Sequence, residues 1–133
     1  MADYKVTVYG YDSGLNELLN HQEKRYDART KRMRVYNTEK AKNDKICRTW
    51  LLKGGMSKVR IDKPISIHYR FYVKDKTHDR SNVSAAFVKS FEDALQELHI
   101  IKNDTYDLVL TPTYYFEVDR KNPRVEVIIQ EME

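Results

Sequence analysis

The chain has 133 residues, of which 33% are charged and 41% hydrophobic, and its formal net charge is +4. This length predicts a single domain over residues 1–133 with a real core, and no apolar run approaches the roughly eighteen residues that a membrane span needs. The N-terminus lacks an apolar signal segment, which predicts a cytoplasmic protein. The lone cysteine, Cys47, excludes an internal disulfide, and beside Ile46 and Trp50 it is expected to be a buried thiol.

Charge is distributed unevenly along the chain. From His21 to Lys53 there are eleven Lys and Arg against four Asp and Glu, a balance of +7, whereas Glu92 to Glu133 has four against ten, a balance of −6. This asymmetry suits a protein that grips a polyanion with one surface and holds cations with another. The alternative is ordinary solvated surface charge.

Near the N-terminus, the sequence predicts a strand and then a basic segment. Val6 and Val8 alternate with other residues between Tyr4 and Tyr9, the pattern of a half-buried strand. Residues 16–36 interleave basic side chains with tyrosines, and such side chains can neutralise phosphates and stack on unpaired bases. The basic residues concerned are Lys24, Arg25, Arg29, Lys31, Arg32 and Arg34. We predict that this segment binds nucleic acid; the alternative is an exposed amphipathic helix with ordinary surface charge.

The middle of the chain predicts a helix followed by a strand. Residues 37–39 read as a helix start, and the pair Gly54-Gly55 reads as its end. After a connector over residues 56–63, the segment from Ile65 to Val73 places alternate apolar residues on one face. His68 falls on the other face and is interpreted as a surface-facing strand residue rather than a metal ligand.

A second helix and two further strands complete the predicted fold. The helix runs from about residue 83 to 98, with an apolar stripe made of Val83, Phe87, Phe91, Ala94, Leu95 and Leu98. Alternation from Tyr106 to Val118 predicts a strand, and Pro112 within it predicts an edge position or a bulge. A turn at 119–123 then leads to a strand over 125–129, expected to complete a hairpin. The order β-α-β-α-β-β predicts a mixed sheet packed by helices, in the α+β class.

Chemistry is expected between Lys74 and Asp104. A charged turn holding Asp79 precedes the second helix, and Asp104 lies just beyond it. One flank of that helix collects Asn82, Ala86, Lys89 and Asp93. Carboxylates gathered at one site hold Mg²⁺ through hard oxygen ligands, so Asp79 and Asp104 are the best candidates for such a site.

Each candidate also has a structural alternative. Asp79 is a favoured helix cap, although Ser81 would cap the helix equally well. Asp104 can be a turn residue, and Lys89 can pair with Asp93 one helical turn away. The residues alone therefore allow a metal site without requiring one.

This stretch resembles the RusA-like Holliday junction resolvases. Their signature is an Asp-x-Asp-Asn turn opening a helix, a Lys within it, an Asp-Ala-Leu run near its end and an Asp a few residues later. The matches are Asp79, Asn82, Lys89, the run Asp93-Ala94-Leu95, and Asn103-Asp104. Ser81 stands where the pattern has its second Asp.

The resemblance implies a RusA-like, homodimeric, Mg²⁺-dependent endodeoxyribonuclease that resolves four-way DNA junctions in recombination and repair, with Mn²⁺ able to substitute. Asp79, Asp104 and Lys89 would be catalytic. Asp79 and Asp104 would hold the metal, with Ser81 and Asp93 as further candidates. Two basic residues of the turn, Lys76 and Arg80, join the basic segment as candidate DNA-binding residues. A two-fold symmetric junction independently favours two equivalent sites in a dimer.

Ser81 also defines the main alternative. A hydroxyl is a weaker Mg²⁺ ligand than a carboxylate, so unless Asp75, Asp93 or Asp107 substitutes, the chain would be a branched-DNA-binding protein that cuts poorly. A structural or protein-interaction domain with a basic face is the third candidate. The sequence has no Gly-rich phosphate loop, no Cys/His zinc spacing and no supported Ser/His/Asp constellation.

Overall fold

A computed structural model describes residues 3–10, 22–74, 80–102 and 112–132, and it describes side chains for residues 3–10, 28–31, 41–74, 84–102 and 112–132. Its elements in chain order are β1 (Asp3–Val8), β2 (Gln22–Asp27), β3 (Arg32–Asn37), α2 (Thr38–Lys53), β4 (Ile65–Val73), α3 (Arg80–Glu97), β5 (Thr113–Val118) and β6 (Arg124–Glu131). The α+β class is confirmed. The predicted order differs from the observed one, because it lacks β2 and β3.

Four strands form one mixed sheet in the order β1-β6-β4-β5. The pair β4–β5 is parallel, while β6 runs antiparallel to both β1 and β4. Strand β5 therefore lies at an edge, as Pro112 predicts. The expected hairpin of β5 and β6 is wrong, because β4 lies between them. After β5 the chain passes the end of β4, where the Asp119 N–H donates to the Val73 carbonyl at 2.8 Å.

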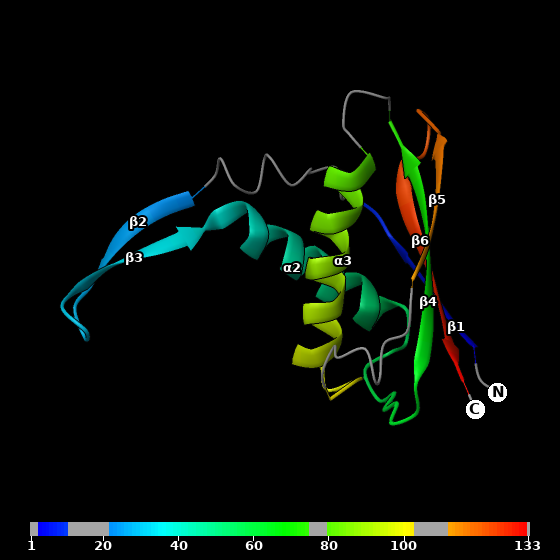
Figure 1. Ribbon diagram of the computed structural model, residues 1–133, viewed down its shortest axis with the longest axis horizontal. Coiled ribbons are helices and arrows are strands. Elements are labelled where there is room, and N and C mark those ends of the chain that lie inside the picture. The colour runs from blue at the N-terminus through cyan, green and yellow to red at the C-terminus, as the bar shows by residue number, and fades with distance from the viewer. Residues whose placement is uncertain (1–2, 11–21, 75–79, 103–111, 133) are drawn as a thin grey trace.

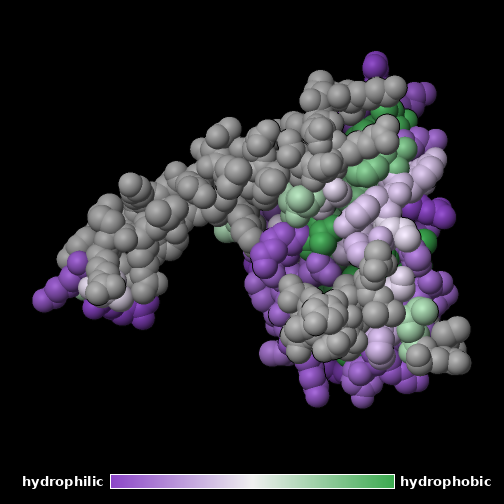
Figure 2. Space-filling view, in the orientation of Figure 1, coloured by the Kyte–Doolittle hydropathy of each residue, from purple (hydrophilic) through white to green (hydrophobic). Residues whose placement is uncertain are grey.

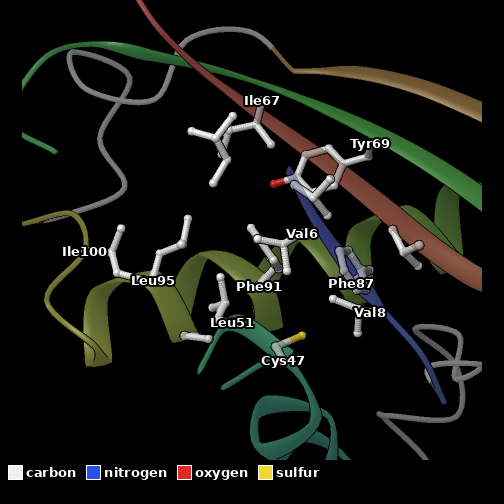
Figure 3. Packing of buried hydrophobic residues seen from close by; sticks show 14 of the residues in the cluster. Val6, Val8, Cys47, Leu51, Ile67, Tyr69, Phe87, Phe91, Leu95 and Ile100 are labelled. Atoms are coloured by element: carbon white, nitrogen blue, oxygen red, sulfur yellow. The ribbon is translucent and has the colours of Figure 1, made fainter. Parts of the chain in front are cut away.

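The core lies on one face of this sheet, where both helices pack (Figure 1). The predicted alternation of β4 is confirmed, since Ile65, Ile67, Tyr69 and Phe71 are all fully buried. Tyr69 and Phe71 meet Phe87 of α3 edge to face at 5.9 and 5.6 Å between ring centroids. Figure 3 shows Tyr69 and Phe87 among the packed core side chains. Fully burying one such ring contributes about 1.5–3 kcal/mol.

Helix α3 is buried over a wider arc than the predicted stripe. Phe87, Phe91, Ala94 and Leu95 are fully buried, as expected; Leu98 is partly buried, and the side chain of Val83 lies outside the described residues. Ala86, which helical spacing places on the same flank as Lys89 and Asp93, is also fully buried. Helix α3 packs against β4 through its aromatic residues and also contacts α2. Ser90 is fully buried as well.

Helix α2 confirms its predicted start and end. It faces the core with Asn43, Cys47 and Leu51, one turn apart, and all three are buried. The buried thiol of Cys47 is thus confirmed. On the flank toward α3, Arg48 donates to Glu97 at 2.7 Å. No helix among the described residues is long and apolar enough to cross a bilayer.

Strands β2 and β3 form a two-stranded hairpin, here called the arm, which projects away from the rest of the fold and continues directly into α2 (Figure 1). The helical alternative is therefore wrong for residues 22–37. The sequence gives a weak strand signal here, because the strands are polar and the tip at 28–31 lacks an Asn-Gly turn. The tip is exposed and hydrophilic, at the far left of Figure 2.

The end of α2 is a Schellman motif. The Met56 N–H donates to the Leu51 carbonyl at 3.1 Å, and the Gly55 N–H donates to the Leu52 carbonyl at 3.2 Å. Gly55 has φ +82°, the left-handed conformation that this motif requires. Met56 and Leu51 are both buried, which supplies the hydrophobic contact that accompanies the motif.

Helix α3 ends in the same motif without a glycine. The Ile100 N–H donates to Leu95 and the His99 N–H to Gln96, each at 2.9 Å. His99 occupies the left-handed position with φ 58°. A side chain at such a φ costs about 1–2 kcal/mol, because Cβ crowds the backbone carbonyl.

These two positions predict opposite effects on stability. His99→Gly should raise the free energy of unfolding by about 1 kcal/mol, because glycine relieves the strain at a modest cost in chain entropy. Gly55→Ala should lower it by about 1–2 kcal/mol; no atom lies within 4 Å of the added Cβ, so the loss comes from the backbone alone. Urea unfolding at neutral pH measures both. Changes of the same sign in the two variants would contradict the assignment of the caps.

Candidate active site

The start of α3 lies at one end of the sheet. Strands β1, β4 and β5 run parallel to one another, so their carboxyl ends meet at this end. Helix α3 begins at Arg80, seven residues after Val73, and Figure 1 shows its first turn beside the end of β4. Ser81 and Asn82 belong to this first turn; their side chains, like that of Arg80, lie outside the described residues. Backbone N–H groups and the macrodipole make such a helix start favourable for anions.

The two main carboxylate candidates flank α3 in sequence. Asp79 directly precedes the helix, and Asp104 follows Lys102, the last described residue after it; both aspartates, and Lys76, lie outside the described residues. The 18 residues of α3 span about 27 Å at 1.5 Å per residue. Arg80 opens the helix, and Lys102 lies five residues beyond its last residue, Glu97. The described residues nearest in sequence to the two aspartates therefore lie toward opposite ends of the helix.

Lys89 and Asp93 form an ion pair on α3. The Lys89 Nζ lies 3.2 Å from Asp93 Oδ1, and the two side chains are 61% and 22% exposed. The structural alternative for Lys89 is thus present in the fold. An exposed pair of this spacing contributes only about 0.3–0.5 kcal/mol, so it holds Lys89 weakly.

No group of three His, Cys, Asp or Glu suited to a metal occurs among the described residues. The candidate ligands fall mainly in residues 75–79 and 103–111, outside that part of the chain. His68 is confirmed as a strand residue on the face away from the helices. Its ring nitrogens pair with Thr113 Oγ1 and Gln130 Oε1, which joins β4 to both neighbouring strands.

A charge network that the sequence analysis missed braces the sheet end where β4 finishes. Arg124 of β6 donates to Asp119 at 2.9 Å and to Glu126 at 2.8 Å, and its guanidinium lies 3.9 Å from the ring centre of Tyr72. Lys5 of β1 lies 3.6 Å from Glu126. The alternation of Arg124 with Glu126 was the available signal, but the sequence does not reveal that Asp119 returns beside them.

The network shifts the pKa values of its members. The hydrogen bond from Arg124 holds the pKa of Asp119 below its ordinary value. Burial alone would raise the pKa of Glu126, but the hydrogen bond and charge of Arg124, with Lys5, bring it below the ordinary value. The hydrogen bond to Glu126 in turn raises the pKa of Arg124. All three groups are therefore charged at neutral pH.

The arm brings together six of the eight predicted DNA-binding residues. In its register Arg25 lies opposite Arg34, and Asp27 lies opposite Arg32. Arg29 and Lys31 are exposed at the tip; the side chains of the other four lie outside the described residues. Like charges directly opposite on paired strands destabilise a hairpin, and a bound polyanion would offset that repulsion.

Residues 19–130 match the family model of endodeoxyribonuclease RusA. The chain belongs to the RusA family. It is therefore an endodeoxyribonuclease of the class that acts on Holliday junctions, and nucleases of this type depend on a metal ion. The match spans the arm, both helices and the segments that hold Asp79 and Asp104. No curated protein matches the chain.

The Arg124 network predicts a specific acid sensitivity. Asp119 and Glu126 have folded-state pKa values below their ordinary values of 3.8 and 4.5. Their contribution to stability is therefore present above pH 4.5 and is lost as the pH falls through the lowered values. Arg124→Gln should be less stable than wild type at pH 7, and this difference should shrink toward pH 3. Urea unfolding across this pH range checks it; two parallel stability curves would contradict the role of the network.

Proposed function

We propose that the protein is a Mg²⁺-dependent nuclease, formed by a single domain over residues 1–133, that binds four-way DNA junctions as a homodimer and nicks opposed strands. The observation that carries this proposal is the family match, which covers Asp79, Lys89, Asp104 and the arm together. Cutting of a synthetic four-way junction in Mg²⁺, and its absence without the metal, tests the proposal directly.

The oxygen donors proposed for the site fit a hard cation. Carboxylates of Asp79 and Asp104, with Ser81 and Asp93 as further candidates, are ligands that suit Mg²⁺ and Mn²⁺. When bound, the ion activates a water molecule and neutralises charge on the phosphate. The aspartates would fix the metal at the start of α3, and the helix N-terminus would favour the phosphate there.

Lys89 would stabilise the charge that develops on the scissile phosphate. Its pair with Asp93 supports this role, because an exposed ion pair costs only about 0.3–0.5 kcal/mol to break. The transition state of phosphodiester cleavage carries more negative charge than the Asp93 carboxylate. It would therefore compete well with Asp93 for the Lys89 ammonium group.

The arm would grip the DNA backbone. The hairpin projects from the fold and carries six basic residues. These residues can contact the phosphates of one DNA duplex of the junction while the rest of the protein binds the branch point. Each phosphate contact contributes a slope of about 0.9 in log affinity against log salt on duplex DNA. Lys76 and Arg80 would add contacts near the start of α3.

The length of α3 favours a site composed from two subunits. Asp79 directly precedes this helix of about 27 Å, and Asp104 lies seven residues beyond its last residue, Glu97. Within one chain, the tail would have to run back almost fully extended for the two carboxylates to share a metal. If two α3 helices pair antiparallel across a two-fold axis, Asp79 of one protomer approaches the partner's Asp104. A symmetric dimer would then carry two such sites for the two nicks.

A second candidate function rests on Ser81. The family pattern has a carboxylate at this position, and the loss of one negative charge weakens binding of Mg²⁺. A chain without a compensating acid would bind branched DNA and cut it poorly.

The site assignment predicts the effect of removing either carboxylate. Asp79→Asn and Asp104→Asn should each lower junction cutting on the order of 100-fold or more, with junction binding near wild type, because the amide removes a charged ligand and not a DNA contact. Single-turnover cutting and DNA anisotropy measure the two effects. Asp62→Asn, at an exposed position of the connector, is the matched control. Wild-type cutting by either variant would refute its assignment.

Mixing these variants tests the composite site. Heterodimers of Asp79→Asn and Asp104→Asn would keep one intact centre if each site uses both chains, and nicking of one strand should return. Subunit exchange is followed separately with tagged protomers. Inactive heterodimers after proven exchange would place each site within one chain.

The two candidate functions predict different outcomes for Ser81→Asp. In an active enzyme that lacks one carboxylate, this change should lower the Mg²⁺ concentration for half-maximal cutting, because a charged ligand is added. In a weakened enzyme it should create activity that the wild type lacks. Metal titration of junction cutting distinguishes the two. An unchanged metal dependence would show that another acid already fills the position.

A further inference from the structure

An aromatic and cationic cluster of Tyr9, Trp50 and Lys53 lies at the carboxyl end of β1. The ring of Tyr9, one residue beyond β1, meets Trp50 of α2 edge to face, with centroids 5.0 Å apart. Lys53 Nζ lies 4.7 Å from the centre of the Trp50 ring. Tyr9 is 38% exposed, and Trp50 packs against the core. The core thus holds the indole in place, and the indole holds the exposed tyrosine.

The cluster borders a lysine stripe on α2. Lys42, Lys45 and Lys53 recur at helical spacing on the exposed side of the helix. Among the described residues, none of the three lysines forms an ion pair with an acidic side chain. Because α2 follows β3 without a linker, this stripe continues the basic arm toward the cluster.

The face of the sheet away from the helices, here called the outer sheet face, has a different charge balance from the α2 surface. It also carries aromatic and basic side chains, and a shallow groove there is lined in part by Arg70, Tyr72 and Tyr115. However, Arg124 and Lys5 on this face are tied to Asp119 and Glu126, and Arg70 is a single exposed cation beside them. The α2 surface therefore offers a polyanion uncompensated positive charge, and the outer sheet face offers less.

The position of the cluster also fits the candidate active site. Strands β1 and β4 are parallel, so Tyr9 lies at the same end of the sheet as the start of α3. DNA with its branch point near α3 would pass close to this end. Bases at a branch point lose a stacking neighbour, and an exposed aromatic ring can replace it.

We propose that Tyr9, supported by Trp50, stacks on a base at the branch point of the DNA, and that Lys42, Lys45 and Lys53 contact the adjoining phosphates. This inference rests on the junction binding proposed above. In this proposal the α2 surface recognises the branch point, and the arm binds a duplex of the junction.

The test uses Trp50, the single tryptophan of the chain, as a local reporter. A four-way junction is added in metal-free buffer, and binding is followed independently by anisotropy of labelled DNA. Bound junction should protect Trp50 from acrylamide quenching. Failure of the anisotropy signal would refute junction binding itself, whereas binding without protection of Trp50 would refute this inference alone.

Variants separate stacking from phosphate contact. Tyr9→Leu should weaken junction binding about 10-fold and linear duplex binding much less, while Tyr9→Phe should retain wild-type affinity, because stacking needs the ring and not the hydroxyl. Lys53→Gln should lower the salt slope by about 0.9 on the junction. The matched controls Tyr115→Leu and Arg70→Gln, on the outer sheet face, should change neither quantity.

Folding of each variant is verified by urea unfolding before binding is compared. Equal junction affinity for Tyr9→Leu and wild type would overturn the stacking assignment, as would an equal loss on junction and linear duplex. An unchanged salt slope in Lys53→Gln would overturn the phosphate contact. A loss of affinity in the outer-face controls equal to that in Tyr9→Leu would place the branch on the other face.

Discussion

The packing of α3 on β4 is the constraint on which the other features depend. Tyr69 and Phe71 from the strand interlock edge to face with Phe87 of the helix, and Phe91 stacks beside Phe87 at 5.5 Å. Removing one such ring from a core typically costs 3–5 kcal/mol. These contacts fix the rotation of α3 about its axis and its position along β4. They therefore place the first turn of the helix beside the end of β4. The segment with Asp79 must join these two fixed points.

Helix α2 transmits this constraint to the arm. Cys47 and Leu51 pack into the same core, and Arg48 bonds to Glu97 of α3. Strand β3 ends at Asn37 and α2 begins at Thr38, so no linker lies between the basic hairpin and a helix anchored in the core. An isolated two-stranded hairpin is marginally stable in water. Its direct continuation into α2 limits the directions in which the arm can present its charges.

The sequence predicted those elements whose periodicity is set by burial. Strand β4 and helices α2 and α3 each have one buried face, and alternation or a three-and-four spacing follows from it. The arm was missed because its strands are rich in polar and charged residues, so no clear apolar alternation marks them. The pairing of β5 and β6 was also wrong, since alternation specifies the faces of a strand and not its neighbours.

The residues alone allowed a metal site at Asp79 and Asp104, but only the resemblance assigned their roles, for a related physical reason. Metal ligands in loops have no periodicity, and Asp79 and Lys89 gain meaning only from their joint spacing. The Tyr9 and Trp50 pair, separated by forty residues, has no sequence signature at all.

The charge asymmetry of the sequence corresponds to two different regions of the structure. Its basic half folds into the arm and α2, where Lys42, Lys45 and Lys53 form no ion pairs with described acids, whereas acids of its other half are partly neutralised by Arg124 and Arg48. Since polyanion binding depends on uncompensated cations, the DNA should approach from the side of the arm and α2.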